Sequence, residues 1–229
     1  MRTATKRLRL MSLACAGLLL AAPAFAETWT HYRTCENSRS EVLIEGTSTM
    51  HPWTVRGRSI EGEVRIAEDF LLKANGEDRR QARQRARGDE KSLPVQAELA
   101  VRSETLRSFR DGRPYSDRMD NIMYEKLRVD EYPEIVYKLE SLDWDETGSE
   151  NEEKVLLVAD GELTVAGVAG RLSMPVEMTR VDSGRLRFSG EVDFKMTDFE
   201  IDPPRALAGM IRTGDEITVR VEWVVVEED

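Results

Sequence analysis

The feature of this chain that most constrains its fold is a repeated alternation of apolar and polar residues in short runs. Successive side chains of a β-strand point to opposite faces, so such alternation is typical of strands with one buried face. The runs cover residues 42–44, 53–55, 60–66, 95–101, 135–139, 155–159, 163–168, 172–178, 186–194 and 217–225. About eight to ten short strands at a spacing of roughly ten residues predict an all-β fold, either a sandwich or an up-and-down barrel.

One segment, about 116–128, has a helical period instead. Ser116 or Asp117 stands at its start, where a short polar side chain can cap free backbone N–H groups. The apolar residues that follow at helical spacing are Met119, Ile122, Met123 and Leu127. Pro133 is expected to stop the helix and return the chain to strand, because proline disfavours helix at the residue before it. We therefore predict one short helix on the β-structure, whose methionines suit either core packing or a surface that adapts to a flexible ligand.

The N-terminus predicts export. Four basic residues precede an apolar stretch over 11–22, and residues 24–26 form a small-x-small cleavage site. We predict a signal peptide over 1–26 and a periplasmic mature protein. The apolar stretch is shorter than the roughly 20 residues that a spanning helix needs, and no later segment approaches that length. We therefore do not expect an integral membrane protein.

Charge and cysteine content narrow the range of partners. Loss of four basic residues with the signal peptide would change the formal net charge from −10 to −14, which disfavours nucleic acids and anionic membranes. Cys35 would then be the single cysteine, which excludes an internal disulfide. Two roles for Cys35 stay open: a thiol that pairs with a partner protein, or a spare cysteine without a function. A homodimer also stays open. We expect residues 27–39 to form an N-terminal segment ahead of one domain over 40–226.

Two charged stretches interrupt the pattern. Residues 73–91 contain almost no apolar side chain, which favours a solvated insertion over an anion-binding site. Residues 143–148 resemble the opening of an EF-hand loop, but Lys154 stands where the bidentate glutamate is needed. We therefore predict an acidic turn there and no metal site.

No catalytic motif is found in the sequence. It contains no phosphate-binding glycine loop, no Gly-x-Ser-x-Gly, no His-Glu-x-x-His and no Cys-x-x-Cys. His51 is the one histidine expected within the domain, and one histidine does not make a zinc site. We predict a protein without catalytic residues or a cofactor. Two alternatives stay open: an enzyme that acts on a lipid with His51 as base, and an interaction or redox module that uses Cys35.

Four segments in order resemble the YceI-like family of exported lipid-binding proteins. They are IEGTSTMHPW at 44–53, MDNIM at 119–123 continuing to YPEIVY at 132–137, GELTVAGV at 161–168, and TDFEIDPP at 197–204. The resemblance implies an extended, lipocalin-like, eight-stranded antiparallel barrel whose apolar cavity takes a long-chain amphiphile such as a polyisoprenoid or an isoprenoid quinone. Family members are similar to binding or carrier proteins, and some are tied to stress responses or electron transport.

The barrel is then expected to hold a ligand rather than only its own side chains. A barrel of about eight strands is wide enough for either. The expected inward positions include both large and small residues, and small residues inside a barrel leave room. The residues expected to line the cavity or its mouth are His51, Trp53, Leu99, Met119, Ile122, Met123, Tyr137, Leu163, Val165, Phe188, Phe194 and Trp223.

Overall fold

The computed structural model describes residues 28–36, 38–67, 70, 93–145, 154–206 and 210–228. The predicted signal peptide (1–26) and the charged insertion (73–91) lie outside the described residues. In the described part of the chain, no helix is both long enough and apolar enough to cross a membrane.

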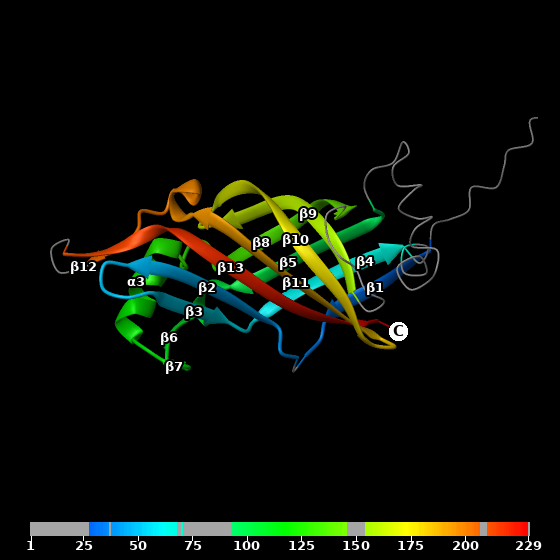
Figure 1. Cartoon of the computed structure of the whole chain (residues 1–229), viewed down its shortest axis with the longest axis horizontal. Coiled ribbons are helices and arrows are strands. Elements are labelled where there is room, and N and C mark those ends of the chain that lie inside the picture. Colours follow the sequence, from blue (N-terminus) through cyan, green and yellow to red (C-terminus); the bar gives the residue numbers. More distant parts are fainter. Residues whose placement is uncertain are drawn as a thin grey trace, which may run out of the picture.

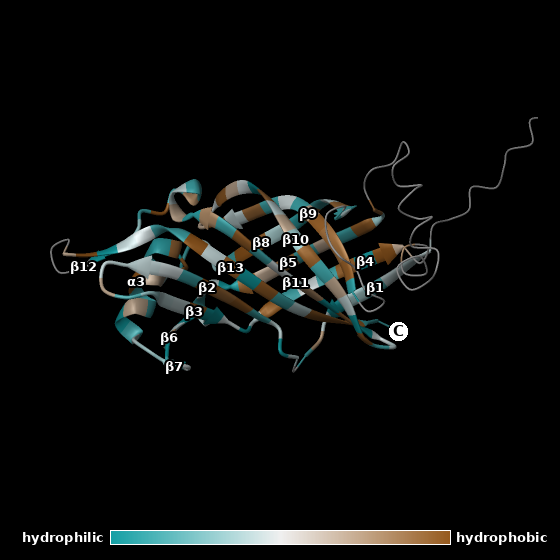
Figure 2. Cartoon of the chain, in the orientation of Figure 1, coloured by the Kyte–Doolittle hydropathy of each residue, from teal (hydrophilic) through white to brown (hydrophobic). Residues whose placement is uncertain are grey.

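Eight antiparallel strands close into a barrel, as predicted (Figure 1). Each strand pairs with the next, and β13 pairs back to β1 through Arg33 and Val226. In spatial order they are β1 (Trp29–Thr34), β4 (Ile60–Ala67), β5 (Val95–Arg102), β8 (Glu134–Trp144), β9 (Lys154–Val165), β10 (Val168–Asp182), β11 (Arg185–Lys195) and β13 (Ile211–Glu227). Figure 2 shows the hydrophobic and hydrophilic residues alternating along these strands, which is the pattern that predicts them.

The long strand β13 has two successive partners on one edge. Near its C-terminal end it pairs with β1, and nearer its start it pairs with β2 (Glu41–Ser48), where Val221 lies opposite Val42. From β2 the sheet continues through β3 (Trp53–Gly57), β6 (Arg107–Arg110) and β7 (Arg113–Pro114). The barrel therefore has two ends. We call the end with β1 the closed end and the end with β2 and β3 the open end.

The predicted helix is present at the open end as α3 (Asp117–Leu127) (Figure 1). The hydroxyl of its N-cap, Ser116, accepts the N–H of Met119 at 3.4 Å. The helix ends at Arg128, which adopts the left-handed conformation (φ 52°), with the N–H of Val129 donated to the Tyr124 carbonyl. The helix thus stops before Pro133 is reached, and Pro133 directly precedes β8.

The hairpin between β9 and β10 differs from the predicted runs. Residues 155–159 and 163–168 are not separate strands, because β9 is continuous to Val165 and β10 begins at Val168. Between them, Ala166 (φ 50°) and Gly167 (φ 81°) form a tight two-residue turn with both φ angles positive. A Cβ on Gly167 would lie 2.4 Å from the Tyr132 ring. The sequence shows no Asn-Gly or Asp-Gly signal for this turn.

Two short 3₁₀ helices and one short strand complete the described elements. They are η1 (Ser103–Thr105), η2 (Met196–Phe199) and β12 (Arg205–Ala206), which pairs with β13.

The N-terminal segment, expected over residues 27–39 to precede the domain, contributes a strand to the barrel. Its strand β1 pairs with β4 on one edge and β13 on the other, and thereby closes the barrel. Only Tyr32 of this strand is fully buried. One buried side chain gives no alternating pattern, which explains why the sequence does not reveal this strand.

Candidate ligand-binding site

A cavity of about 840 Å³ occupies the open half of the barrel. Inward-facing side chains of β2, β3, β5, β8, β9, β10, β11 and β13 form its wall, and α3 covers part of it. The lining is mostly aliphatic and aromatic. The same strands continue into the closed half of the barrel. The cavity therefore ends where side chains from opposite walls are large enough to contact one another.

That boundary can be followed along single strands. On β10, Leu172 and Met174 line the cavity, whereas Val176 two residues further is buried in the core. On β13, Val221 lines the cavity and Trp223 lies in the core. The closed half is thus filled by its own side chains, and the open half is hollow.

Ten of the twelve residues expected at the cavity do line it: His51, Trp53, Leu99, Met119, Ile122, Met123, Tyr137, Leu163, Val165 and Phe194. Phe188 and Trp223 are elsewhere, in the core of the closed half, with ring centroids 5.9 Å apart. The Trp223 indole N–H donates to the Thr34 hydroxyl at 2.9 Å, which holds that ring in place. Alternation identifies the inward face of a strand, but it does not show how far along the strand the interior is filled.

Other lining residues were not singled out from the sequence. Some share the alternation of their strands and could have been found by it: Val42, Ile44, Leu172, Met174, Val192, Val219 and Val221. Phe199 and Ile201 are different, because they follow the last residues of β11 in a region without periodicity. The Phe199 ring packs on Phe194 with centroids 5.2 Å apart, which places this segment on the cavity wall.

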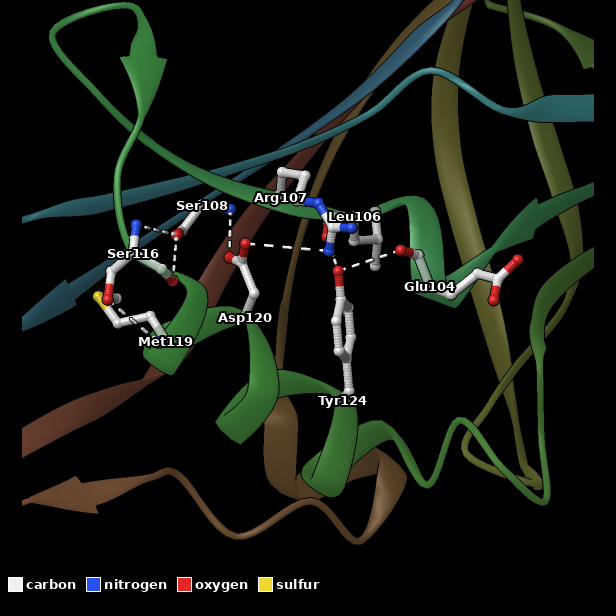
Figure 3. Close-up of polar contacts among 8 residues, drawn as sticks. All are labelled: Glu104, Leu106, Arg107, Ser108, Ser116, Met119, Asp120 and Tyr124. Carbon is white, nitrogen blue, oxygen red and sulfur yellow. Dashed lines mark hydrogen bonds and ion pairs between the residues drawn. The ribbon is translucent and has the colours of Figure 1, made fainter.

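The helix α3 is held at the cavity by a buried carboxylate (Figure 3). Asp120 is only 4% exposed, and its carboxylate accepts the backbone N–H of Ser108 at 2.7 Å. Arg107 lies 3.9 Å from the other carboxylate oxygen. One turn later, the Tyr124 hydroxyl lies 2.7 Å from the carbonyl oxygen of Leu106. These bonds tie the polar face of α3 to β6 and to the residue before it.

The adjacent face of α3 presents apolar side chains to the cavity, which Asp120 also borders. Met119, Ile122 and Met123 all line it, in agreement with the predicted helical stripe. Methionine side chains are flexible and polarizable, so they can pack against ligands of differing shape. Asp120, which bonds the helix to β6, helps to position this stripe.

His51 and Trp53 lie at the mouth of the cavity, in and after the loop between β2 and β3. The Ser48 hydroxyl shapes this loop by accepting the N–H of His51 at 3.2 Å and donating to its carbonyl at 2.7 Å. The Trp53 indole donates to the Thr47 carbonyl at 2.9 Å, and its ring lies over Gly46, where a Cβ would be 2.2 Å away. Gly46 therefore provides the space for the Trp53 ring.

The His51 ring has structural contacts and no catalytic partner among the described residues. Its Nδ1 lies 2.8 Å from the Pro52 carbonyl oxygen, and its ring meets that of Tyr115 edge to face at 6.0 Å. No described carboxylate is bonded to it. The geometry that a general base requires, an orienting partner beside a reacting group, is not shown here.

Tyr137 is a polar exception at the inner limit of the cavity. It is the last lining residue on β8, since Leu139 packs on the core. Its side chain lies over Gly161, where a Cβ would be 2.7 Å from the phenolic oxygen. The hydroxyl is buried without a hydrogen-bond partner among the described residues. Burial, with added repulsion from Asp160 and Glu140, raises the pKa of Tyr137 to about 12.

The described residues were also compared with the needs of a metal site and of a reactive thiol. They contain no group of three His, Cys, Asp or Glu side chains placed to hold a metal ion. Of the EF-hand-like stretch, residues 146–148 lie outside the described residues. Cys35 carries a free, half-buried thiol, and its backbone N–H donates to the Val224 carbonyl. Cys35 is not among the residues that line the cavity.

The fold and the cavity together define a class of protein: an antiparallel β-barrel that is packed at one end and hollow and apolar at the other. A family model described as the YceI-like domain matches residues 34–225. The chain therefore belongs to the YceI-like family, as the four sequence segments predict. A search of curated proteins finds no significant match to this chain.

Two of the matching solved structures are similar to this chain over most of their length. BcnA from Burkholderia cenocepacia superposes with a TM-score of 0.56 at 14% identity, covering 81% of this chain and 95% of that one. A domain from Saccharophagus degradans, described as a polyisoprenoid-binding domain implicated in plant cell wall breakdown, has a TM-score of 0.56 at 13% identity. The match covers 86% of this chain and 98% of that domain. At these identities the likeness establishes the fold.

Proposed function

We propose that this protein is exported to the periplasm, where it binds and carries one long-chain apolar ligand, a polyisoprenoid or an isoprenoid quinone, without transforming it. The observation that carries the proposal is the apolar cavity of about 840 Å³ that ends on a packed core. Membership of the YceI-like family supports it, as does the shared fold with a domain described as polyisoprenoid-binding.

The physical basis for binding is burial of hydrocarbon. Each methylene group removed from water contributes about 0.8 kcal/mol, so a long chain binds tightly with few polar contacts. Ligand pockets usually occupy about 300–1,000 Å³, and this cavity lies in that range. Shape and apolarity are sufficient for such a site, which is consistent with the lack of a catalytic motif and with the structural bonds of His51.

The test is native mass spectrometry and lipid extraction of the purified protein, compared between two variants. Met174→Trp adds bulk inside the cavity, whereas Ser173→Trp adds the same side chain at the preceding residue of β10, which is exposed. We expect the wild type and Ser173→Trp to retain an amphiphile and Met174→Trp to lose most of it.

Two results would count against the proposal. One is a wild-type protein that never retains an apolar ligand, even when expressed with its export signal. The other is equal retention by the two tryptophan variants, because that would place the ligand outside the cavity.

A further inference from the structure

Exposed apolar side chains gather around the mouth of the cavity. In the described part of the chain, four large apolar side chains are exposed, and three of them lie on segments at the open end: Met50 (68% exposed), Met210 (75%) and Tyr115 (39%). The fourth, Val181, lies on β10 beside the turn to β11, at the opposite end of the barrel. A single exposed apolar residue is common on protein surfaces and needs no explanation, whereas several at one end form a group. The exposed apolar side chains are therefore concentrated around the mouth of the cavity.

These side chains belong to one continuous surface although they come from three segments. The Thr49 hydroxyl donates to the Met210 carbonyl at 3.3 Å, which joins the β2–β3 loop to the start of β13. On the other side of Met50, the His51 ring meets the Tyr115 ring. All three segments lie toward the open end in Figure 1. We call this surface the rim: residues 48–53, 110–118, 204–206 and 210–213.

The rim is basic in a protein that is otherwise strongly acidic. It contains five arginines against two aspartates, whereas the whole chain has a formal net charge of −10. The arginines are Arg110, Arg113, Arg118, Arg205 and Arg212, all of them exposed. Arg110 donates to the Tyr115 hydroxyl at 3.3 Å and stacks on its ring.

Several arginines elsewhere on the barrel are paired with acidic side chains. Arg33, Arg102 and Arg220 each lie beside a carboxylate. Within the described residues, no ion pair joins Arg110, Arg113, Arg118 or Arg205 to a carboxylate. The positive charges of these four arginines are therefore not neutralised by ion pairs with described side chains.

We propose that the rim docks the protein on an anionic lipid bilayer, with the cavity mouth facing the membrane. Arginine side chains near such a surface are attracted to its anionic headgroups. Methionine and tyrosine side chains at the same level can enter the boundary between headgroups and acyl chains. Docking would let an insoluble ligand pass between bilayer and cavity without crossing water. That transfer rests on the proposed function, whereas docking itself is measurable without ligand.

The experiment is flotation of the purified full chain with two kinds of vesicle, phosphatidylcholine alone and an equal mixture of phosphatidylcholine and phosphatidylglycerol. We expect the wild type to bind the mixed vesicles, to bind more weakly as salt is raised, and to bind phosphatidylcholine poorly. Arg113→Gln should weaken binding to the mixed vesicles about fivefold, the loss expected for one basic residue near an anionic surface. Met210→Glu should weaken it at least as much, because it places a carboxylate among the headgroups.

Two variants at the other end serve as charge-matched controls. Val181→Glu matches Met210→Glu, and Arg33→Gln matches Arg113→Gln, so each pair changes the net charge equally. Binding that falls only in the rim variants supports docking. No binding by the wild type, or an equal loss in the controls, overturns it.

Ligand content separates this proposal from the previous one. Met210 and Arg113 do not line the cavity, so native mass spectrometry of these variants should still show bound amphiphile. Loss of vesicle binding with ligand retained identifies docking as a separate property. Vesicle binding by a protein that never holds a ligand would instead contradict the carrier function alone.

Discussion

At the scale of single residues, two tyrosine hydroxyls provide a direct comparison of satisfied and unsatisfied polar groups. The Tyr137 hydroxyl is buried without a partner among the described residues, whereas that of Tyr124 contacts the Leu106 carbonyl. Tyr137→Phe should leave the free energy of unfolding of the ligand-free protein unchanged or raise it by about 1 kcal/mol, because it removes an unpaired buried group. Tyr124→Phe should lower it by about 1 kcal/mol. Urea denaturation measures both, and an equal loss in the two variants would show that Tyr137 has a partner.

Tyr137 also predicts how stability depends on pH. Its pKa is raised from 10.0 to about 12 in the folded protein, so above pH 10 the unfolded chain releases this proton while the fold retains it. The contribution of Tyr137 is therefore fully present below pH 10 and is lost as pH rises toward 12. Urea midpoints across this interval should fall less steeply for Tyr137→Phe than for wild type. Parallel pH profiles would disagree with the burial of this phenol.

At the scale of elements, α3 depends on one carboxylate. Asp120→Ala leaves the buried N–H of Ser108 without an acceptor, and it should lower the free energy of unfolding by about 2 kcal/mol. Because Met119, Ile122 and Met123 are positioned by this helix, ligand affinity should fall as well. Asp117→Ala is the matched control, since Asp117 is exposed in the same first turn and its loss should cost a few tenths of a kcal/mol.

A denaturation curve and a ligand-binding titration on the two aspartate variants give the result. If both variants lose the same stability, α3 is held mainly by its apolar face. If Asp120→Ala is less stable but binds ligand normally, the helix does not shape the site.

The elements also show what a sequence can and cannot reveal. Long alternating runs predict β8, β10 and β13 because each carries enough inward residues to show a period. The sequence does not predict β1, because Tyr32 is the single fully buried residue of that strand. It does not predict the β9–β10 turn either, because Ala166 adopts a positive φ without a typical turn sequence. The inward face of β11 and β13 was predictable, but the packed positions of Phe188 and Trp223 were not, because filling depends on side chains from several strands at the same level.

At the scale of the whole molecule, net charge and local charge lead to different expectations. A net charge of −10 disfavours contact with anionic membranes, yet the arginines of the rim lie together at one end. Long-range repulsion is screened within about 10 Å at ordinary ionic strength, so a local basic surface can dominate once it is close to a bilayer. Composition describes the average surface and could not reveal the rim, whose residues come from four separate stretches of the chain.

Ligand removal should affect the stability of the whole barrel. A ligand present at about 100 times its Kd stabilises the folded state by about 2.7 kcal/mol. For a domain of this size, delipidation should therefore lower the Tm by about 5–10 °C. Calorimetry before and after solvent extraction of lipid measures the shift, with re-addition of the extract as control. An unchanged Tm would mean that the extracted lipid was not bound in the fold.

The two partners of β13 have a consequence for how that stabilisation spreads. One continuous strand borders β2 in the hollow half and β1 in the packed half, so the two halves share a backbone and cannot open independently. Occupancy of the hollow half should then slow amide hydrogen exchange at Val225 and Val226, which lie beyond the cavity. The bound lipid would act as a missing piece of the hydrophobic core, and the loaded barrel would resist local opening better than the empty one.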